Sequence, residues 1–108
     1  MLSLDTKHTT VELLSGLIRQ EIDFYLIDCE SRGLSKYTII NYREELKPVL
    51  LFLESIGVYQ VIDIKPEHLR ECFVNIAKKR NPGGINSIYR ALRAFLNWWN
   101  LETETKDW

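Results

Sequence analysis

The stretch Pro82–Trp99, PGGINSIYRALRAFLNWW, decides the fold because it has the pattern of one amphipathic helix. At 100° per residue its apolar side chains fall within about a third of the helix circumference, the usual width of a face that packs on a core. That predicted face consists of Ile85, Ile88, Tyr89, Leu92, Phe95, Leu96 and Trp99. The opposite side carries Asn86, Arg90, Arg93 and Asn97. Amide and guanidinium groups in such a row suit recognition of phosphates and base edges, and they equally suit a solvated surface.

The first of three further helical segments is predicted from about Thr10 to Arg32. Thr9 and Glu12 have the spacing of a capping box at its start, and Gly33 suits the left-handed turn that ends many helices. Apolar side chains recur along it at helical spacing, so we expect one face to be buried. That face consists of Leu14, Leu17, Ile18, Ile22, Tyr25, Leu26 and Cys29.

The second segment is predicted to be helical from about Lys36 to Ile56, with Ser35 as its cap and Gly57 at its end. Pro48 removes a backbone hydrogen bond inside it, so we expect a kink near residues 44–48 rather than two separate helices. Its predicted buried face is Ile39, Tyr42, Leu46, Val49, Leu50, Leu53 and Ile56. Three apolar residues outside this face need cover from another helix or a partner: Ile40, Leu51 and Phe52.

A linker at residues 58–64 is expected to place Val61, Ile62 and Ile64 in the core without forming a strand. The third helical segment is predicted from Pro66 to about Lys79, because proline is favoured at the first helical position. Its predicted buried residues are Leu69, Cys72, Phe73 and Ile76. The cations that close it suit either the negative end of the helix dipole or a phosphate, and they are Lys78, Lys79 and Arg80.

Asn81 is expected to cap the next helix and Pro82 to begin it. Gly83 and Gly84 have no side chain, so the backbone there can come close to another group. A neighbouring helix and a phosphate group are both compatible with that pair.

The whole pattern indicates an all-α fold, a compact bundle of four main helices. A chain of 108 residues with 45% hydrophobic residues is sufficient for one domain with its own core. We assign that domain to residues 10–100. Residues 1–9 show no periodicity and are expected to be a flexible arm, and residues 101–108 are expected to begin a linker.

No metal site, cofactor or membrane segment is expected. His8 and His68 have no Cys or carboxylate at ligand spacing. Cys29 and Cys72 are too few for a disulfide framework, so we expect reduced thiols inside helices. No apolar run approaches the roughly 20 residues of a membrane span, and no signal peptide is recognisable. A cytoplasmic protein is therefore expected.

The net charge of −1 is unusual for a protein that binds nucleic acid. The charges are distributed unevenly, however. Residues 1–32 contain six acidic and three basic side chains, whereas residues 33–100 contain six acidic and ten basic ones. Such an uneven field can present one basic surface on a nearly neutral protein.

Three stretches stand out when they are taken in this order and at this spacing. They are ESRGLSKYTIINYREELKPVLLFLESIG at 30–57, DIKPEHLRECFVNIAKKR at 63–80 and GGINSIYRALRAFLNWW at 83–99. Together they resemble the N-terminal core-binding domain of tyrosine recombinases, the phage integrase and Xer/Cre-like enzymes, over about residues 11–100. The resemblance implies a SAM-like bundle that forms half of a clamp around double-stranded DNA. A C-terminal catalytic domain would form the other half.

The resemblance further implies that the second and fourth helices face the major groove, and that the first helix contributes contacts between protomers on DNA. Mapped onto this sequence, the groove-facing positions are Lys36, Tyr37, Thr38, Asn41, Asn86, Ser87, Arg90 and Arg93. Arg90 and Arg93 can read guanine edges or hold phosphates, and the amides of Asn41 and Asn86 have the geometry to read adenine. The cations better suited to phosphate contact are Lys36, Lys78, Lys79 and Arg80.

The family's chemistry requires a nucleophilic Tyr with Arg, Lys and His residues, and this set cannot be assembled here. The five tyrosines all lie in the predicted helices or their linker. We therefore expect a domain without catalytic activity of its own, monomeric in isolation, from a parent recombinase that cleaves and rejoins DNA.

Two other classes of protein are alternatives to this hypothesis. A helix-turn-helix regulator needs a recognition helix after a turn of three or four residues, and the connections at 58–65 and 81–84 do not place one in that way. A helical protein interaction domain remains an alternative, because Ile40, Leu51 and Phe52 lack a predicted core position. Trp98 and Trp99 cannot both face one core stripe, so Trp98 is expected to contact a partner or the turn that follows.

Overall fold

Four α-helices account for most of residues 16–103, the part of the chain that the computed structural model describes. They are α2 (Ile18–Ser31), α3 (Lys36–Ser55), α4 (Pro66–Ala77) and α5 (Pro82–Thr103), with a short 3₁₀ helix, η1 (Val61–Asp63), before α4. Within this part, the only strand-like pairing is an isolated bridge between Leu17 and Gln60. The predicted all-α bundle of four main helices is confirmed.

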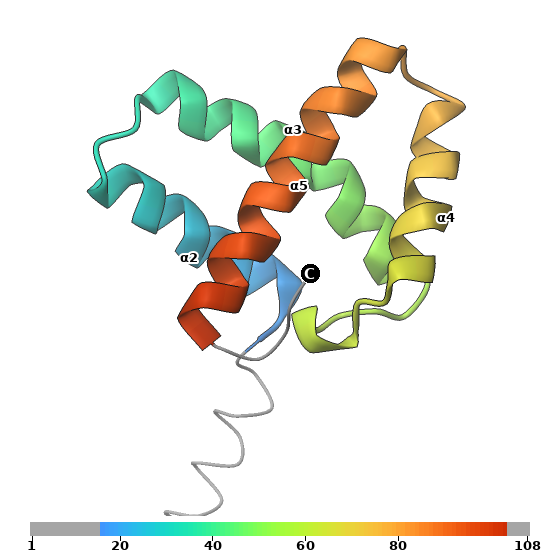
Figure 1. The fold of residues 1–108 in the computed structure, drawn as a ribbon, viewed down its shortest axis with the longest axis horizontal. Helices are drawn as coiled ribbons and strands as arrows, with labels where there is room; N and C mark the ends of the chain where they lie inside the picture. Colours follow the sequence, from blue (N-terminus) through green and yellow to red (C-terminus); the bar gives the residue numbers. More distant parts are fainter. Residues whose placement is uncertain (1–15, 104–108) are drawn as a thin grey trace, which may run out of the picture.

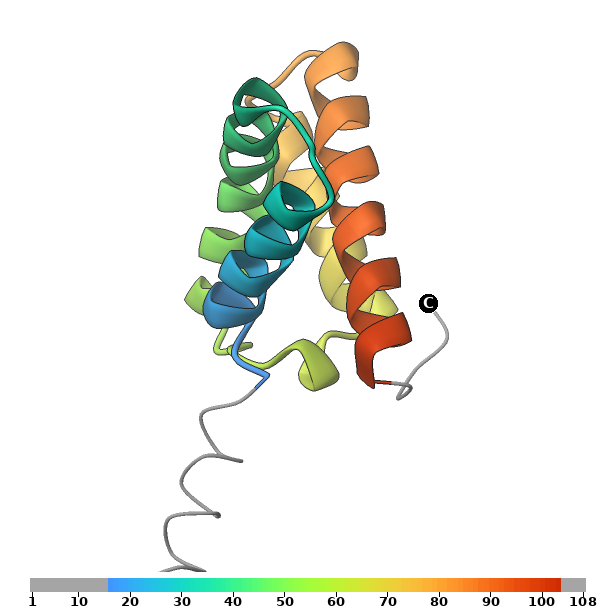
Figure 2. The same ribbon diagram turned by 90° about the vertical axis from the view of Figure 1, so that its left-hand side faces the viewer.

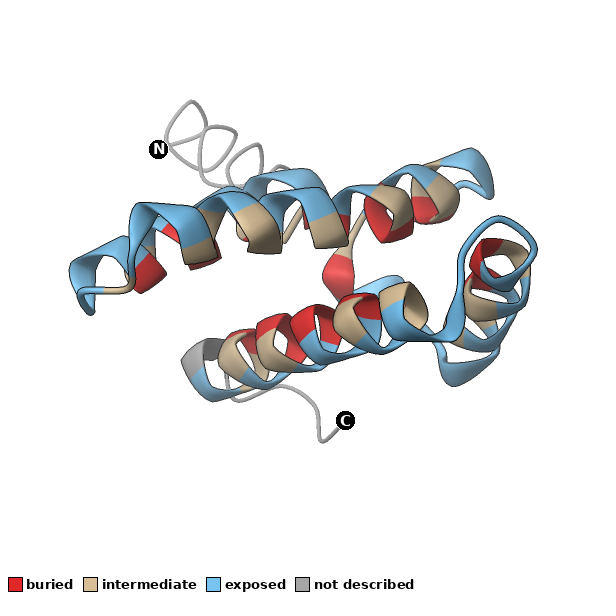
Figure 3. Cartoon of the chain, turned by 90° about the horizontal axis from the view of Figure 1, so that it is seen from above, coloured by how far each residue is buried: buried red, intermediate tan, exposed pale blue. Residues whose placement is uncertain are grey.

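The helices enclose the core from two sides. Helices α2 and α3 lie on one side and α5 on the other, with their buried residues facing inward (Figure 3). Helices α3 and α5 cross, each contacts the other three helices, and α4 packs against both of them (Figure 1). The most deeply buried large side chains come from every helix and from the linker, and include Ile18, Leu46, Leu53, Ile64, Cys72, Ile88 and Phe95.

The start of the first helix was predicted wrongly. Helix α2 begins at Ile18, because Gly16 has a φ of +84° and the chain there pairs with the linker. The N–H of Ile18 donates to the carbonyl of Tyr59, and the N–H of Val61 donates to the carbonyl of Gly16, both at 2.8 Å. The predicted capping box and Leu14 lie outside the described residues. Gly33, with a φ of +86°, ends α2 as expected.

The second helix agrees with its predicted bounds to within one residue. The N–H of Thr38 donates to Ser35 Oγ at 3.1 Å, which confirms the cap. Helix α3 is continuous through Pro48, so there are not two separate helices. The kink itself stays a prediction.

The last two helices end at different residues from those expected. Helix α4 ends at Ala77, so the three cations that follow belong to the turn rather than to the helix. Helix α5 runs on to Thr103, so residues 101–103 of the predicted linker are helical. Residues 1–9 and 104–108 lie outside the described part.

Three residues predicted to be buried are exposed instead. Ile62 is 46% exposed because residues three apart share a side in a 3₁₀ turn, and here Val61 and Ile64 take the inward side. Ile56 is 41% exposed at the end of α3, where it follows the last helical residue. Tyr89 is 49% exposed at the edge of the α5 apolar stripe. Conversely, Val58 and Ala91 are buried and were not predicted to be.

Candidate nucleic-acid interface

One edge of the molecule collects most of the residues that the sequence singled out. In Figure 1 the beginning of α3 lies at one end of the upper edge, and the turn between α4 and α5 with the beginning of α5 lies at the other end; both also lie at the top in Figure 2. A helix carries partial positive charge at its N-terminus, so each of these two ends favours an anionic group beside it.

At the start of α3, Lys36 and Tyr37 are exposed and make no side-chain hydrogen bond or ion pair within the described chain. Thr38 is half-buried, and its Oγ1 lies 2.9 Å from Ser35 Oγ. Its hydroxyl therefore belongs to the helix cap. Asn41, one turn further on, is also half-buried.

The turn between α4 and α5 forms an open depression of about 520 Å³ lined by Lys79, Arg80, Asn81 and Gly84. The N–H of Gly84 donates to Asn81 Oδ1 at 2.8 Å, which confirms Asn81 as the cap. A Cβ at Gly83 or Gly84 would meet that same Asn81 oxygen and no neighbouring helix. Because this N–H is already occupied, the exposed cations are the better phosphate ligands in this turn.

The outer face of α5 is polar, as predicted. Asn86, Arg90, Arg93 and Asn97 are all exposed. Ser87 is half-buried, and its hydroxyl donates to the carbonyl of Gly83 at 3.3 Å. The Arg93 guanidinium donates from Nη1 to the Tyr89 hydroxyl at 3.2 Å.

Ion pairs among the described residues all involve α2. Arg19 pairs with Glu54 at 2.7 Å, Arg43 with Asp23 at 3.2 Å, and Arg32 with Asp28 at 3.0 Å. The first two pairs tie α2 to α3. Within residues 16–101, the cations of the α4–α5 turn and of α5 have no carboxylate partner, so their charge is available to a ligand.

The titratable side chains of the interior are buried in the core or cap a helix. Burial raises the pKa of the Cys72 thiol to about 11 and also raises the pKa of the Tyr25 hydroxyl, with a further contribution from Cys29. Cys29 and Cys72 are free, buried thiols. His68 Nδ1 accepts a hydrogen bond from the N–H of Lys65 at 3.0 Å, so this imidazole caps the first turn of α4.

Neither a metal cluster nor a membrane span is found in the described part of the chain. No group of three or more His, Cys, Asp or Glu side chains converges among residues 16–101. No helix there is long and apolar enough to cross a membrane.

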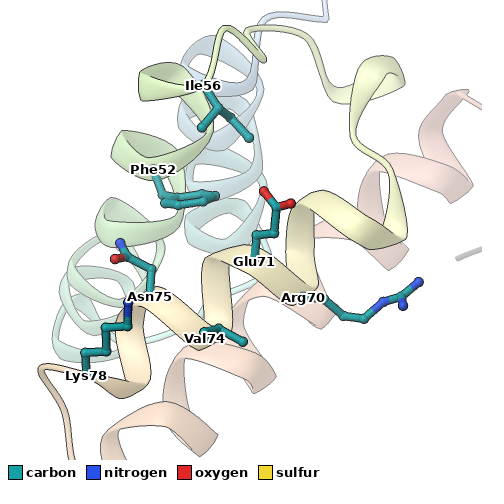
Figure 4. Close-up of a pocket in the computed structure, with 7 residues that line it drawn as sticks. All are labelled: Phe52, Ile56, Arg70, Glu71, Val74, Asn75 and Lys78. Carbon is teal, nitrogen blue, oxygen red and sulfur yellow. The ribbon is translucent and has the colours of Figure 1, made fainter.

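An apolar hollow of about 490 Å³ lies between α3 and α4, and Lys78, the cation directly after α4, is among the residues that line it (Figure 4). Phe52 of α3 and Ile56, directly after α3, point toward α4, which contributes Val74, while Arg70 points away from them. Phe52 is half-buried here, whereas Ile40 and Leu51 are exposed. This hollow is the structural feature that best fits the alternative of a protein interaction domain.

Trp98 is accommodated inside the bundle. Its ring lies 5.4 Å from that of Tyr25 and 6.2 Å from that of Phe95, measured between centroids. Its buried indole N–H has no acceptor among the described residues. The contacts found for Trp98 among the described residues are with the aromatic core, and residues 104–108 of the segment that follows lie outside the described part.

Tyr89 is a surface residue, although its helical spacing predicts a buried position. Its ring packs on Phe73 of α4, with centroids 5.8 Å apart, and its hydroxyl holds Arg93. The spacing of four between Tyr89 and Arg93 is the signal that indicates this pair, because such residues are neighbours on a helix surface.

Comparison with known protein families supports this account of the fold. Residues 22–103 match the family model described as phage integrase, N-terminal SAM-like domain. The match takes in α3, α4 and α5 completely and α2 from Ile22 onward. No curated protein and no solved structure gives a match.

Proposed function

This chain belongs to the phage integrase N-terminal SAM-like domain family, and from that premise we propose that it binds double-stranded DNA through α3 and α5. The family places the chain in the context of tyrosine recombinases and implies an interaction with DNA. In the proposed role the domain grips the recombination site, and strand cleavage belongs to a catalytic domain of the parent enzyme. Other recombinase protomers are its proposed partners on DNA, and the isolated domain is monomeric.

The observation that supports this proposal best is the set of unpaired cations at the edge where α3 and α5 begin. Lys36 stands at the start of α3, and Lys79 and Arg80 line the depression before α5. Cations of this kind position a protein on the phosphate backbone and release its counterions.

The outer face of α5 has suitable dimensions for the major groove. From Asn86 to Asn97 the helix rises about 17 Å at 1.5 Å per residue. This length corresponds to about five base pairs at 3.4 Å per step. Arg90 extends from the middle of that row without a protein partner among the described residues, so it is our candidate for reading a base edge.

The proposed mode of binding predicts weak and salt-sensitive affinity. Six cations are assigned to the interface: Lys36, Lys78, Lys79, Arg80, Arg90 and Arg93. The slope of log affinity against log salt concentration should therefore be no steeper than about −5. The net charge of −1 gives little long-range attraction beyond these contacts.

A titration of the ¹⁵N-labelled chain with duplex DNA at low salt tests the proposal. We expect amide shift changes over residues 36–41 and 78–93, and none around Ile56 and Val74 in the apolar hollow. In a parallel anisotropy assay, Arg90→Ala combined with Arg93→Ala should lower both the affinity and the salt slope. The matched control is Lys47→Ala combined with Lys65→Ala, which removes two exposed cations outside the proposed interface.

Two results would contradict the proposal. One is the absence of any shift at low salt, and the other is an affinity and salt slope that the double arginine variant leaves unchanged. The second candidate, a protein interaction domain, rests on the apolar hollow between α3 and α4. It would be favoured if Ile56→Asp and Val74→Asp abolished binding to a partner protein while DNA caused no shifts.

A further inference from the structure

The two arginines on the outer face of α5 differ in how they are held. Arg93 donates from Nη1 to the Tyr89 hydroxyl at 3.2 Å. Arg90 makes no hydrogen bond or ion pair with any described residue. Both side chains are exposed, so the difference lies in their neighbours rather than in burial.

Tyr89 is itself held in place by a second helix. Its ring meets Phe73 of α4 at a centroid distance of 5.8 Å and an interplanar angle of 59°. Phe73 is half-buried and packs against the core. An aromatic ring has only two rotatable side-chain bonds, so this contact leaves the hydroxyl little freedom of position. The orientation of Arg93 therefore depends on contacts that begin in α4.

The Tyr89 hydroxyl retains a donor after it has accepted from Arg93. A phenolic oxygen accepts through its lone pairs and donates through its single O–H. At 49% exposure, this O–H can point to a ligand beside the guanidinium. One O–H donor and one guanidinium, side by side on one surface, match the acceptor oxygens of a phosphate group.

Around the helix axis, Tyr89 and Arg93 are about 40° apart, whereas Tyr89 and Arg90 are about 100° apart, at 3.6 residues per turn. The Tyr89 hydroxyl holds Arg93 and not Arg90. Arg90 and Arg93 are about 60° apart on the same wheel, so the pair occupies the side of the polar face next to α4, while Arg90 lies at the opposite margin of that face.

We propose that Tyr89 and Arg93 form a preassembled clamp for one phosphate of the DNA backbone, with Phe73 fixing the tyrosine ring and Arg90 left free to contact base edges. This inference rests on the proposed DNA-binding function. Tyr89 acts in it both as a phosphate donor and as a positioning residue for Arg93. A guanidinium that is ordered before binding loses less side-chain entropy on binding, so the clamp strengthens DNA binding without an additional charge.

The test compares Tyr89→Phe with the unchanged chain, because this substitution removes the hydroxyl and retains the ring that packs on Phe73. Tyr59→Phe is the matched control, since Tyr59 is an exposed tyrosine in the linker before η1. We expect Tyr89→Phe to lower affinity for a duplex by about two- to ten-fold, the range for ordering one long side chain. The unfolding midpoint should not change, and Tyr59→Phe should not alter affinity.

Coupling between residues distinguishes a clamp from independent contacts. Once Arg93→Ala is present, adding Tyr89→Phe should lower the affinity much less than it does in the unchanged chain. Combined with Arg90→Ala, it should lower affinity by its full factor. Without DNA, ¹⁵N relaxation of the Arg93 Nε–H should show a more mobile side chain in the Tyr89→Phe variant than in the unchanged chain.

The outcomes separate this inference from the function on which it rests. If the arginine variants weaken binding but Tyr89→Phe changes neither affinity nor Arg93 mobility, the clamp is wrong and the DNA-binding function stands. If the unchanged chain binds no duplex at low salt, the DNA-binding function is wrong, and the clamp is overturned with it.

Discussion

The indole N–H of Trp99 donates a hydrogen bond to a carboxylate oxygen of Glu21, with 2.9 Å between Nε1 and Oε1. Trp99 is only 4% exposed, and the bond joins the last part of α5 to the first turn of α2. An indole N–H can only donate, and a buried donor that lacks an acceptor is costly. This bond therefore helps determine how α5 lies against α2.

Glu21→Ala should destabilise the fold by about 1–3 kcal/mol, because it removes a hydrogen bond between a charged acceptor and a donor on a buried side chain. Urea unfolding followed by circular dichroism measures the change. Glu21→Gln is the matched control, since its amide oxygen can still accept the hydrogen bond from Trp99. This variant should lose less than half as much stability as Glu21→Ala. A loss for Glu21→Ala no larger than that for Glu21→Gln would contradict this explanation.

Two glycine substitutions should have opposite effects. Gly33 has a φ of +86° with nothing within 4 Å of an added Cβ, so Gly33→Ala should cost about 1–2 kcal/mol through backbone conformation alone. Gly83 lies in the first turn of α5, where an added Cβ makes only ordinary contact with Asn81. Gly83→Ala should therefore stabilise by about 0.5 kcal/mol. Thermal unfolding of both variants checks the signs, and equal signs would disprove the argument.

Stability should depend on the Cys72 thiol at alkaline pH. Burial raises its pKa from 9.0 to about 11, so the folded state keeps this proton over a range in which the unfolded state loses it. The contribution of the protonated Cys72 thiol to stability is complete below pH 9 and is lost as pH rises toward 11. The free energy of unfolding should therefore decrease by about 1 kcal/mol between pH 8 and pH 10. Urea unfolding at both pH values measures it.

The control for that experiment is Cys72→Ala, measured over the same pH range. The variant loses packing at every pH, but its decrease between pH 8 and pH 10 should be smaller by the thiol contribution. Identical decreases in the two proteins would show that Cys72 does not titrate as proposed.

The α4–α5 turn should contribute affinity without sequence preference. Lys79→Ala combined with Arg80→Ala removes two cations from the depression before α5. The salt slope should become shallower by about 2, and affinity should fall by the same factor on unrelated duplexes. Anisotropy titrations at several salt concentrations measure both quantities. A loss confined to one DNA sequence would instead indicate base recognition by these residues.

Periodicity and capping chemistry predicted the helices well where the chain itself supplies the determinants. Ser35 and Asn81 accept from the backbone N–H groups of Thr38 and Gly84, as their residue types and positions suggested. The resemblance to the integrase N-terminal domain, built on three stretches, agrees with the family match over residues 22–103. The groove-facing residues and the two domain boundaries remain predictions.

The errors arose where a contact distant in sequence decided the outcome. The pairing of residues 16–18 with the linker at residues 59–61 ends the helical run that the periodicity continued back to Thr10. Tyr89 satisfied the spacing of a core stripe, but α4 covers only part of its ring, so its hydroxyl remains at the surface. Spacing assigns a residue to a helix face without showing where the neighbouring helix ends.

By itself, the sequence determined the helical segments, their caps and the two-sided character of Pro82–Trp99, because these depend on residues within a few positions of one another. The tertiary structure decided which cations are available for a ligand. Asp23 and Glu54 neutralise Arg43 and Arg19 between α2 and α3, while the cations of α5 have no such partner among the described residues. It also placed the ring of Tyr89 against Phe73 of another helix, with 5.8 Å between the ring centroids. Such contacts form only when α2, α3, α4 and α5 pack together, and no local pattern specifies them.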